Sequence, residues 1–388
     1  MVIMKLSLSS AAAFFLGLLF LLSAPARAAG PAFTPAPPSI AGSSYFLMDF
    51  NSSRVLAEKD PDKRVSPASL TKIMTVYVVF RELKSGHLTL DEKVTVSQNA
   101  WQTGGSKMFI EVNKQVSVED LLQGVIIQSG NDASVALAEH VAGSEQTFAD
   151  MMNEQAARLG MVNSHFENAT GLPSPNHYSS AHDLALLAQA VIRDFPEFYR
   201  WDSQKEFTYN GITQTNRNLL LWRDASVDGL KTGFTDDAGY CMVASAKRED
   251  MRLISVVMGT ASPNARANES QSLLNYGFRF FETHRLYQAG TPLTETRVRK
   301  GEKSLLPVGV GEDVYVTAPR KHFNELKPES QLDKVVIAPL KKGDTVGSLI
   351  VTLNGETVLT KPLVAMEDVA EGSFFRRLYD AALVFLER

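Results

Sequence analysis

The fold and the site of this chain are indicated most clearly by the stretch Ser66-Pro67-Ala68-Ser69-Leu70-Thr71-Lys72 and the apolar segment that follows it to Phe80. Ser66 is a favourable helix N-cap and Pro67 suits the first helical position, so Ser69 is predicted to lie in the first turn. Backbone N–H groups of a first turn have no intrahelical acceptor and can therefore receive an oxyanion. Lys72 follows on the same helix face and is the only charged residue from Leu70 to Phe80.

The chemistry of Lys72 follows from that apolar surrounding. A helix that is apolar all round is buried, and desolvation together with the positive helix terminus lowers the pKa of a buried lysine. A neutral lysine beside a serine can act as its base. On its own, however, the Ser-x-x-Lys pattern is weak, and a capping serine with a lysine whose amine reaches solvent is the commoner explanation of it.

Two further motifs give the pattern its specificity. Ser129-Gly130-Asn131 lies between the apolar segment 121–127 and a predicted helix at 133–141, so it is expected to form a turn that opens into a cleft. Lys231-Thr232-Gly233 lies in a predicted edge strand, where Gly233 lets a ligand approach the backbone. The three motifs in this order are far more specific than any one of them.

The remaining pattern predicts an α/β (α+β) fold. Strands at 44–49 and 54–58 form a hairpin, helical patterns dominate from 70 to 159, and strands return from 227 to 260. This order predicts an antiparallel sheet covered by helices, with the active cleft between the sheet and a helical subdomain. From 291 to 360 short β-branched runs, with a hairpin turn at Asn354-Gly355, predict a separate small all-β domain.

Composition excludes several classes of protein. The chain has 388 residues, of which 44% are hydrophobic, and a net charge of −4, which makes nucleic acid an improbable partner. Its only cysteine, Cys241, excludes an internal disulfide and favours a small core residue over a reactive thiol. No cluster has metal-ligand spacing and no glycine-rich phosphate loop follows a strand, so no metal and no cofactor is expected.

The N-terminus predicts export. Lys5 precedes the apolar run from Ala11 to Leu22, and Ala26-Arg27-Ala28 is a small-x-small cleavage site. Residues 1–28 are therefore predicted to be a signal peptide, and an uncleaved anchor is the alternative. The chemistry of the protein is then expected outside the cytoplasm.

With these motifs in place, the sequence resembles the penicillin-recognising serine enzymes, and within them the low-molecular-mass penicillin-binding proteins of peptidase family S11, which are D-alanyl-D-alanine carboxypeptidases. The resemblance extends to the segments 171–187, 216–218 and 227–240, to the β domain and to the C-terminal segment. It implies a β-lactamase/transpeptidase-like domain and removal of the terminal D-alanine from peptidoglycan stem peptides through an acyl-enzyme. It also implies that β-lactams acylate the same serine.

The resemblance assigns roles residue by residue. Ser69 would be the nucleophile, Lys72 its base, and Ser129 the proton relay toward the leaving D-alanine. The substrate would be held by Asn131, Arg217, Lys231, Thr232, Gly233 and Phe234. Asn131 would bind the substrate amide, and Arg217, Lys231 and Thr232 its terminal carboxylate. Phe234 stands where some members have histidine, and its backbone N–H would form the oxyanion hole with that of Ser69.

Alternatives on the same fold stay open at this point. A class A-like β-lactamase needs a carboxylate base between 163 and 178, and the only acid there, Glu167, lacks the asparagine of that family at position 171, which is Gly171. A DD-endopeptidase would usually lack the β domain and the anchor. A catalytically silent wall-binding protein would not need Ser69, Lys72 and Lys231. His182-Asp183 fits a capping box after Ser180 better than a Ser-His-Asp triad.

The C-terminal segment predicts a membrane contact. Apolar residues recur at helical spacing through residues 374–386, with Arg376, Arg377 and Asp380 on the polar side. This pattern resembles an interfacial amphipathic helix, and a helix docked on its own domain is the alternative. The predicted domains are thus 29–285 (penicillin-binding DD-peptidase), 286–365 (small β domain) and 366–388 (membrane anchor), on the periplasmic face of the cytoplasmic (inner) membrane.

Overall fold

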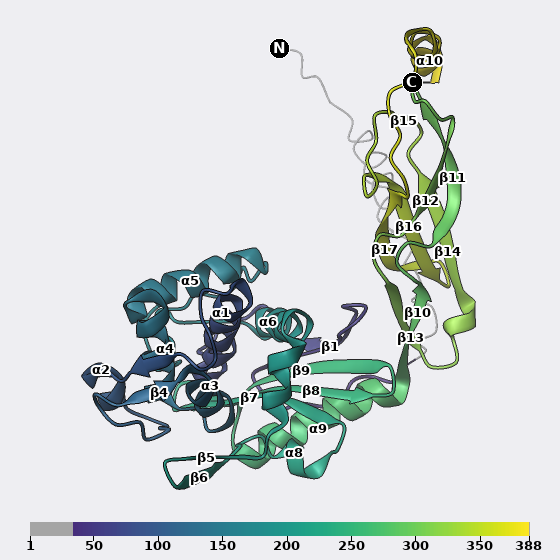
Figure 1. Cartoon of the computed structure of the whole chain (residues 1–388). Coiled ribbons are helices and arrows are strands. Elements are labelled where there is room, and N and C mark those ends of the chain that lie inside the picture. The colour runs from purple at the N-terminus through teal and green to yellow at the C-terminus, as the bar shows by residue number, and fades with distance from the viewer. Residues whose placement is uncertain (1–33, 388) are drawn as a thin grey trace, which may run out of the picture. The chain divides into compact units, whose positions relative to one another are not determined.

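The computed structural model describes residues 34–387. The predicted signal peptide, residues 1–28, lies outside the described residues. Within them, the centre of the first domain is a five-stranded antiparallel sheet in the order β2-β1-β9-β8-β7 (Figure 1). Its strands are β1 (Ser44–Asp49), β2 (Val55–Lys59), β7 (Val227–Thr235), β8 (Gly239–Arg248) and β9 (Met251–Thr260).

The two faces of this sheet are covered by different helices, as the alternation of side chains along β1 demonstrates. Phe46 and Met48 pack into one apolar core with α6 (Ala181–Asp194) and the helical subdomain. Tyr45 and Leu47 face the opposite side and pack with α9 (Pro263–Phe280). Successive strand residues point to opposite faces, so one short strand contributes to two cores. The predicted antiparallel sheet covered by helices is confirmed.

The helical subdomain contains the long buried helix that the sequence predicted. This helix, α1, runs over Lys72–Ser85, and all of its residues from Lys72 to Phe80 are buried. The other elements of the first domain are the helices α2 (Gln98–Gln102), α3 (Val118–Ile127), α4 (Asn131–Ala142), α5 (Glu145–Arg158), α7 (Pro196–Tyr199) and α8 (Leu220–Arg223), the 3-10 turns η1 (Ala68–Thr71) and η2 (Arg200–Ser203), and the short strands β3 (Lys93–Thr95), β4 (Gln115–Ser117), β5 (Glu206–Tyr209) and β6 (Ile212–Thr215).

The following part of the chain is all-β, as predicted. Its strands are β10 (Phe281–Tyr287), β11 (Pro292–Arg299), β12 (Leu305–Gly309), β13 (Val314–Pro319), β14 (Leu326–Leu332), β15 (Val336–Ile337), β16 (Thr345–Leu353) and β17 (Glu356–Ala365), with the 3-10 turn η3 (Phe323–Glu325). Asn354 and Gly355 join β16 to β17 with φ angles of 51° and 84°, the left-handed pair that a two-residue hairpin turn needs. The predicted boundary at 285/286 falls inside β10.

The last element is α10 (Phe374–Glu387), which is amphipathic. Asp380 and Val384 on it are buried, whereas Phe374, Phe375, Leu378 and Tyr379 are exposed. Among the helices of residues 34–387, none has the length and apolarity that crossing a bilayer would require.

Candidate active site

Ser69 lies in the 3-10 turn η1, immediately before α1, and not in the first turn of a regular helix. Pro67 holds the N-cap position without a side-chain hydrogen bond, so the predicted capping by Ser66 is wrong. The cause lies in the backbone, because Ala68 has a left-handed φ of 48° and a regular helix cannot begin before it. The turn still places Ser69 three residues, or about one helical turn, before Lys72.

Lys72 has the surroundings that its sequence predicted. It is fully buried, and its Nζ lies 3.2 Å from Ser69 Oγ, 2.6 Å from Asn131 Oδ1 and 2.5 Å from the Thr170 carbonyl oxygen, each within hydrogen-bond distance. Burial holds the pKa of Lys72 well below its ordinary value, and the nearby charge of Lys231 lowers the pKa further. When the amine is neutral, its two N–H bonds can donate to Asn131 and Thr170, and its lone pair can accept the hydrogen bond of the Ser69 hydroxyl.

Ser129 and Gly130 lie in the predicted turn between α3 and α4, and Asn131 is the first residue of α4. Ser129 has a left-handed φ of 66°, and its buried Oγ has no hydrogen-bond partner among the described residues. Asn131 is fixed from both ends of its amide, since Oδ1 accepts from Lys72 and Nδ2 donates to the Gly104 carbonyl oxygen at 2.6 Å. The turn thus brings an unpaired hydroxyl and an oriented amide to the serine–lysine pair.

Lys231-Thr232-Gly233 lies on β7, the edge strand of the sheet, as predicted. β7 packs closely on the serine turn, because a Cβ atom at Gly233 would lie only 3.0 Å from the Pro67 carbonyl oxygen. Lys231 is buried, and its pKa is lowered to about 7 by burial and by the charge of Arg217. The edge strand therefore combines a close backbone approach with a buried lysine amine.

Arg217 is held in place by its two neighbours in the sequence. Asn216 Oδ1 accepts from the Asn218 N–H at 2.9 Å, and Asn218 Nδ2 donates to the Gly229 carbonyl oxygen at 3.0 Å. Both asparagines are buried, whereas Arg217 itself is exposed. The segment is thereby fixed to the start of β7, and Arg217 is left free to reach the cavity.

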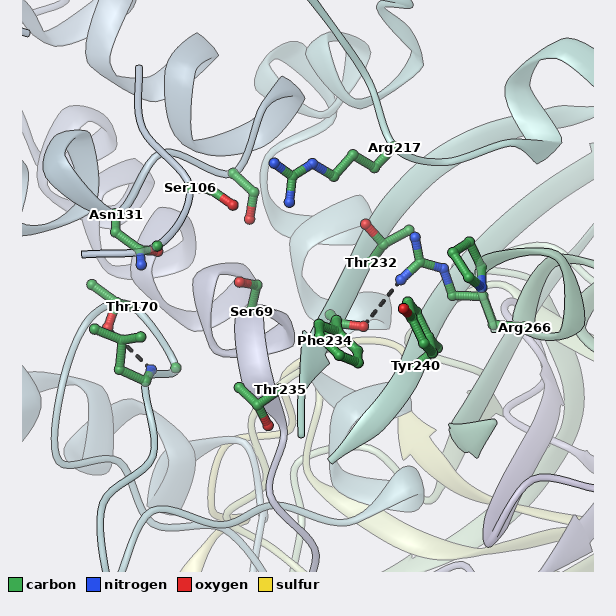
Figure 2. A pocket seen from close by; sticks show the side chains of 16 residues that line it. Ser69, Ser106, Asn131, Thr170, Arg217, Thr232, Phe234, Thr235, Tyr240 and Arg266 are labelled. Carbon is green, nitrogen blue, oxygen red and sulfur yellow. Dashed lines mark hydrogen bonds between the residues drawn. The ribbon is translucent and has the colours of Figure 1, made fainter. Parts of the chain in front are cut away.

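These side chains surround one cavity of about 560 Å³. In Figure 2 Ser69 lies at its centre, between Asn131 and Thr170 on one side and Thr232 and Phe234 on the other. The residues that line the cavity are Ser69, Gly105, Ser106, Ser129, Asn131, Thr170, Gly171, Leu172, Arg217, Thr232, Gly233, Phe234, Thr235, Tyr240, Pro263 and Arg266. Lys72 and Lys231 are not part of the lining, but Lys72 is hydrogen-bonded to Ser69 and Asn131, and Lys231 directly precedes Thr232 on β7. The structure thus brings all the predicted site residues together.

Several supporting residues could not be predicted from the sequence because their contacts are long-range. The buried Asp132 carboxylate accepts from the N–H groups of Met108, Phe109 and Ile110, at 2.8, 2.9 and 3.3 Å, and so fixes the loop that carries Ser106. The only available signal was the position of Asp132 directly after Asn131.

His177 supports the serine turn in the same way. Its Nδ1 accepts from the Glu167 N–H at 3.1 Å, so Nε2 carries the proton and donates to Thr71 Oγ1 at 2.7 Å. Burial lowers the pKa of His177 to about 4, which keeps the ring neutral. A neutral histidine therefore orients the residue between Leu70 and Lys72.

The remaining candidates lie outside the cavity. Ser180 Oγ accepts from the Asp183 N–H, which is the predicted cap, and His182 contacts Asp62 instead of a serine. Cys241 is fully buried, and burial raises the pKa of its thiol to about 11. No group of His, Cys, Asp and Glu within residues 34–387 could hold a metal ion.

The carboxylate that a class A-like β-lactamase would need is directed elsewhere. Glu167 accepts hydrogen bonds from the Ser174 hydroxyl and from the Asn176 N–H, and it is not part of the cavity lining. Position 171 also has no room for an asparagine, because a Cβ atom at Gly171 would lie 1.8 Å from the Ala68 carbonyl oxygen. Both observations count against that alternative.

A helix-covered antiparallel sheet, with a serine and a buried lysine beside a Lys-Thr-Gly edge strand, defines a penicillin-recognising serine enzyme. Comparison with known proteins narrows this class. The family of D-alanyl-D-alanine carboxypeptidases called peptidase S11 matches residues 31–262, and the C-terminal domain of penicillin-binding protein 5 matches residues 281–371. The chain therefore belongs to the peptidase S11 family, and the predicted function, a serine-type D-alanyl-D-alanine carboxypeptidase, is confirmed.

Individual relatives agree with this assignment. The chain is 47% identical over 355 residues to the D-alanyl-D-alanine carboxypeptidase DacC of Escherichia coli K12, with 89% of each chain covered. It is 44% identical over 354 residues to DacA of the same organism, with 89% of this chain and 88% of the relative covered. The crystal structure of penicillin-binding protein 5 from Haemophilus influenzae has a TM-score of 0.84 at 45% identity, over 87% of this chain and 100% of that one.

Proposed function

We propose that Ser69 is the nucleophile that this carboxypeptidase uses to remove the terminal D-alanine of peptidoglycan stem peptides. The observation that carries the proposal is the 3.2 Å hydrogen-bond distance between Ser69 Oγ and the Nζ of the fully buried Lys72. Since the pKa of this amine is lowered by burial, it can accept the serine proton at neutral pH.

Acylation begins when Ser69 Oγ attacks the carbonyl carbon of the penultimate D-alanine while its proton passes to Lys72 Nζ. The carbonyl oxygen becomes an oxyanion and receives the backbone N–H groups of Ser69 and Phe234. When the C–N bond breaks, the nitrogen of the departing D-alanine takes a proton from Lys72 through Ser129. The unpartnered, buried Oγ of Ser129 is free for this relay.

Substrate recognition is divided between two sides of the cavity. The terminal carboxylate is received by Arg217, Lys231 and the hydroxyl of Thr232, through charge-assisted and neutral hydrogen bonds. The Asn131 amide and the backbone at Gly233 hold the peptide. Water then attacks the ester at Ser69, which releases the shortened peptide and restores the hydroxyl.

The same geometry supports the proposal that β-lactams are covalent inhibitors of this enzyme, because a β-lactam presents a carboxylate and a strained amide to the same groups. The carboxylate would lie against Thr232 and Arg217, and the amide carbonyl carbon would face Ser69 Oγ. Slow loss of the resulting ester is expected, since the Glu167 carboxylate is directed into its own loop.

Release of D-alanine from a pentapeptide tests the assignment of the nucleophile. Ser69→Ala is expected to abolish release, whereas Ser66→Ala, in the same segment but outside the cavity lining, is expected to leave it unchanged. D-alanine release by a folded Ser69→Ala protein at the wild-type rate would refute the assignment.

The location of the enzyme is part of the proposal. Residues 1–28 are proposed to direct export, and α10, in the proposed anchor 366–388, to hold the enzyme as a peripheral protein on the periplasmic face of the inner membrane. Four large apolar side chains of α10 are exposed together, namely Phe374, Phe375, Leu378 and Tyr379. Burying such side chains in the interface contributes about 1.5–3 kcal/mol each.

The opposite side of α10 is tied to the β domain, 286–365. Asp380 accepts from the Lys300 N–H at 2.5 Å, and Arg376 donates to the Glu302 carbonyl oxygen at 3.2 Å. Arg377 forms an ion pair with Glu371, which reduces the charge that it can offer to anionic lipids. The apolar face therefore contributes most of the proposed attraction to the membrane, and the basic residues contribute less.

A further inference from the structure

Arg266 is a buried cation at the cavity that none of the steps above uses. It lies in the first turns of α9, is only 6% exposed and belongs to the cavity lining. It forms no ion pair with a carboxylate of the described residues. Burial lowers the pKa of Arg266 to about 10, so the guanidinium keeps its charge at neutral pH. A buried, unpaired cation needs a role that offsets its desolvation.

The contacts of Arg266 surround a single peptide group. Its Nη1 donates to the Gly233 carbonyl oxygen at 3.1 Å, the bond that Figure 2 draws as a dashed line beside Phe234. Its guanidinium carbon lies 5.5 Å from the centroid of the Tyr240 ring. Tyr240 in turn stacks on Phe234, with ring centroids 4.2 Å apart and an interplanar angle of 26°. Arg266 and the two rings therefore hold the link between Gly233 and Phe234.

This peptide group is the one that carries the Phe234 N–H. The Gly233–Phe234 bond is not among the cis peptide bonds of the described residues, so its C=O and N–H point in opposite directions. A charged donor on the carbonyl oxygen fixes the plane of the peptide group. It also draws electron density toward that oxygen, and the N–H on the other side becomes a stronger donor.

We propose that Arg266 is a positioning residue of the oxyanion hole, which orients and polarises the Gly233–Phe234 peptide group so that the Phe234 N–H stabilises the oxyanion formed at Ser69. This inference rests on the proposed function, because it takes the Phe234 N–H as an oxyanion donor. The competing role for Arg266 is direct binding of the substrate carboxylate beside Arg217. A positioning role changes the rate constant of the acylation step, whereas a role in carboxylate binding changes the affinity for the substrate.

Acylation of the purified enzyme by a penicillin separates these roles. We expect Arg266→Met to lower the acylation rate constant on the order of 10-fold, less than the ~100-fold or more that loss of a whole oxyanion donor costs. The dissociation constant of the complex before acylation should stay within about 2-fold. Arg266→Lys, which keeps a cation, should recover part of the rate.

Infrared spectroscopy of the acyl-enzyme supplies a readout that a merely structural role would not move. The ester carbonyl at Ser69 lies in the same oxyanion hole, so its stretching band should shift to higher frequency in Arg266→Met and by a smaller amount in Arg266→Lys. The matched control is Arg223→Met, which removes hydrogen bonds to Asn264 and Asn268 of the same helix but does not touch Gly233. It should leave the band and the rate constant unchanged.

Three results would overturn the inference. The first is an unmoved carbonyl band in both Arg266 variants, or in Arg266→Lys alone if Arg266→Met does not fold. The second is weaker binding of the penicillin with an unchanged acylation rate constant, which would assign Arg266 to the carboxylate. The third is a wild-type protein that forms no ester at Ser69, and only this result would also refute the proposed function.

Discussion

Replacing Lys72 with arginine is expected to slow acylation of Ser69 by at least ~100-fold, the low end of what a positioned general base contributes. In free energy this is about 2.7 kcal/mol of lost transition-state stabilisation. The reason lies in the site, where a fully buried Lys72 Nζ lies 3.2 Å from Ser69 Oγ with its pKa held well below the ordinary value by burial. Arginine stays charged at any working pH and cannot take the serine proton.

The assay is the time course of labelling by a fluorescent penicillin, measured across a range of pH. Because the pKa of Lys72 is lowered, its neutral fraction grows as the pH rises through that lowered value, and wild-type acylation should grow with it. The Lys72→Arg variant should lack this rise. Lys84→Arg, on the exposed part of the same helix, is the matched control and should acylate normally. A folded Lys72→Arg protein that acylates within ~10-fold of wild type would refute the reasoning.

Four other changes test the recognition, the stability and the location of the enzyme. Arg217→Ala and Thr232→Val should both impair hydrolysis of a pentapeptide, and unchanged kinetics in both would reject their role at the carboxylate. The unfolded chain protonates His177 near pH 6.5 and the folded chain only near pH 4, so stability should rise with pH between these values. Urea unfolding should show that about 3 kcal/mol of this pH dependence disappears in His177→Gln. Deleting residues 366–388 should release soluble, active enzyme, and a truncated form that stays with membranes on fractionation would count against the anchor.

The sequence predicted the elements and the motifs because these depend on local pattern. The apolar run after Leu70 predicted a buried helix, and Asn354-Gly355 predicted a hairpin turn, since each signal lies within a few neighbouring residues. The order of the motifs that contain Ser69, Ser129 and Lys231 predicted one site, although these residues are far apart in the sequence. Reliance on local pattern also explains why the predicted helix start at Ser66 is wrong.

The predicted helix start was wrong because the backbone at Ala68 is not helical, at a point where it packs against a segment remote in the sequence. The Ala68 carbonyl oxygen lies against Gly171, where no Cβ atom would fit, and Ala68 takes a left-handed conformation. The roles of Asp132, His177 and Arg266 depend likewise on contacts with loops and strands remote in the sequence. Such contacts leave no local pattern, and only the fold reveals them.

The central claim is that Ser69, activated by Lys72, is the residue that becomes acylated. The most direct test is mass spectrometry of the full mature protein after brief incubation with a penicillin, followed by proteolysis and assignment of the modified residue. One equivalent of adduct on the peptide that contains Ser69, absent from Ser69→Ala and present in Ser66→Ala, is the predicted result. An adduct on any other residue, or an unchanged adduct in Ser69→Ala, would contradict the claim.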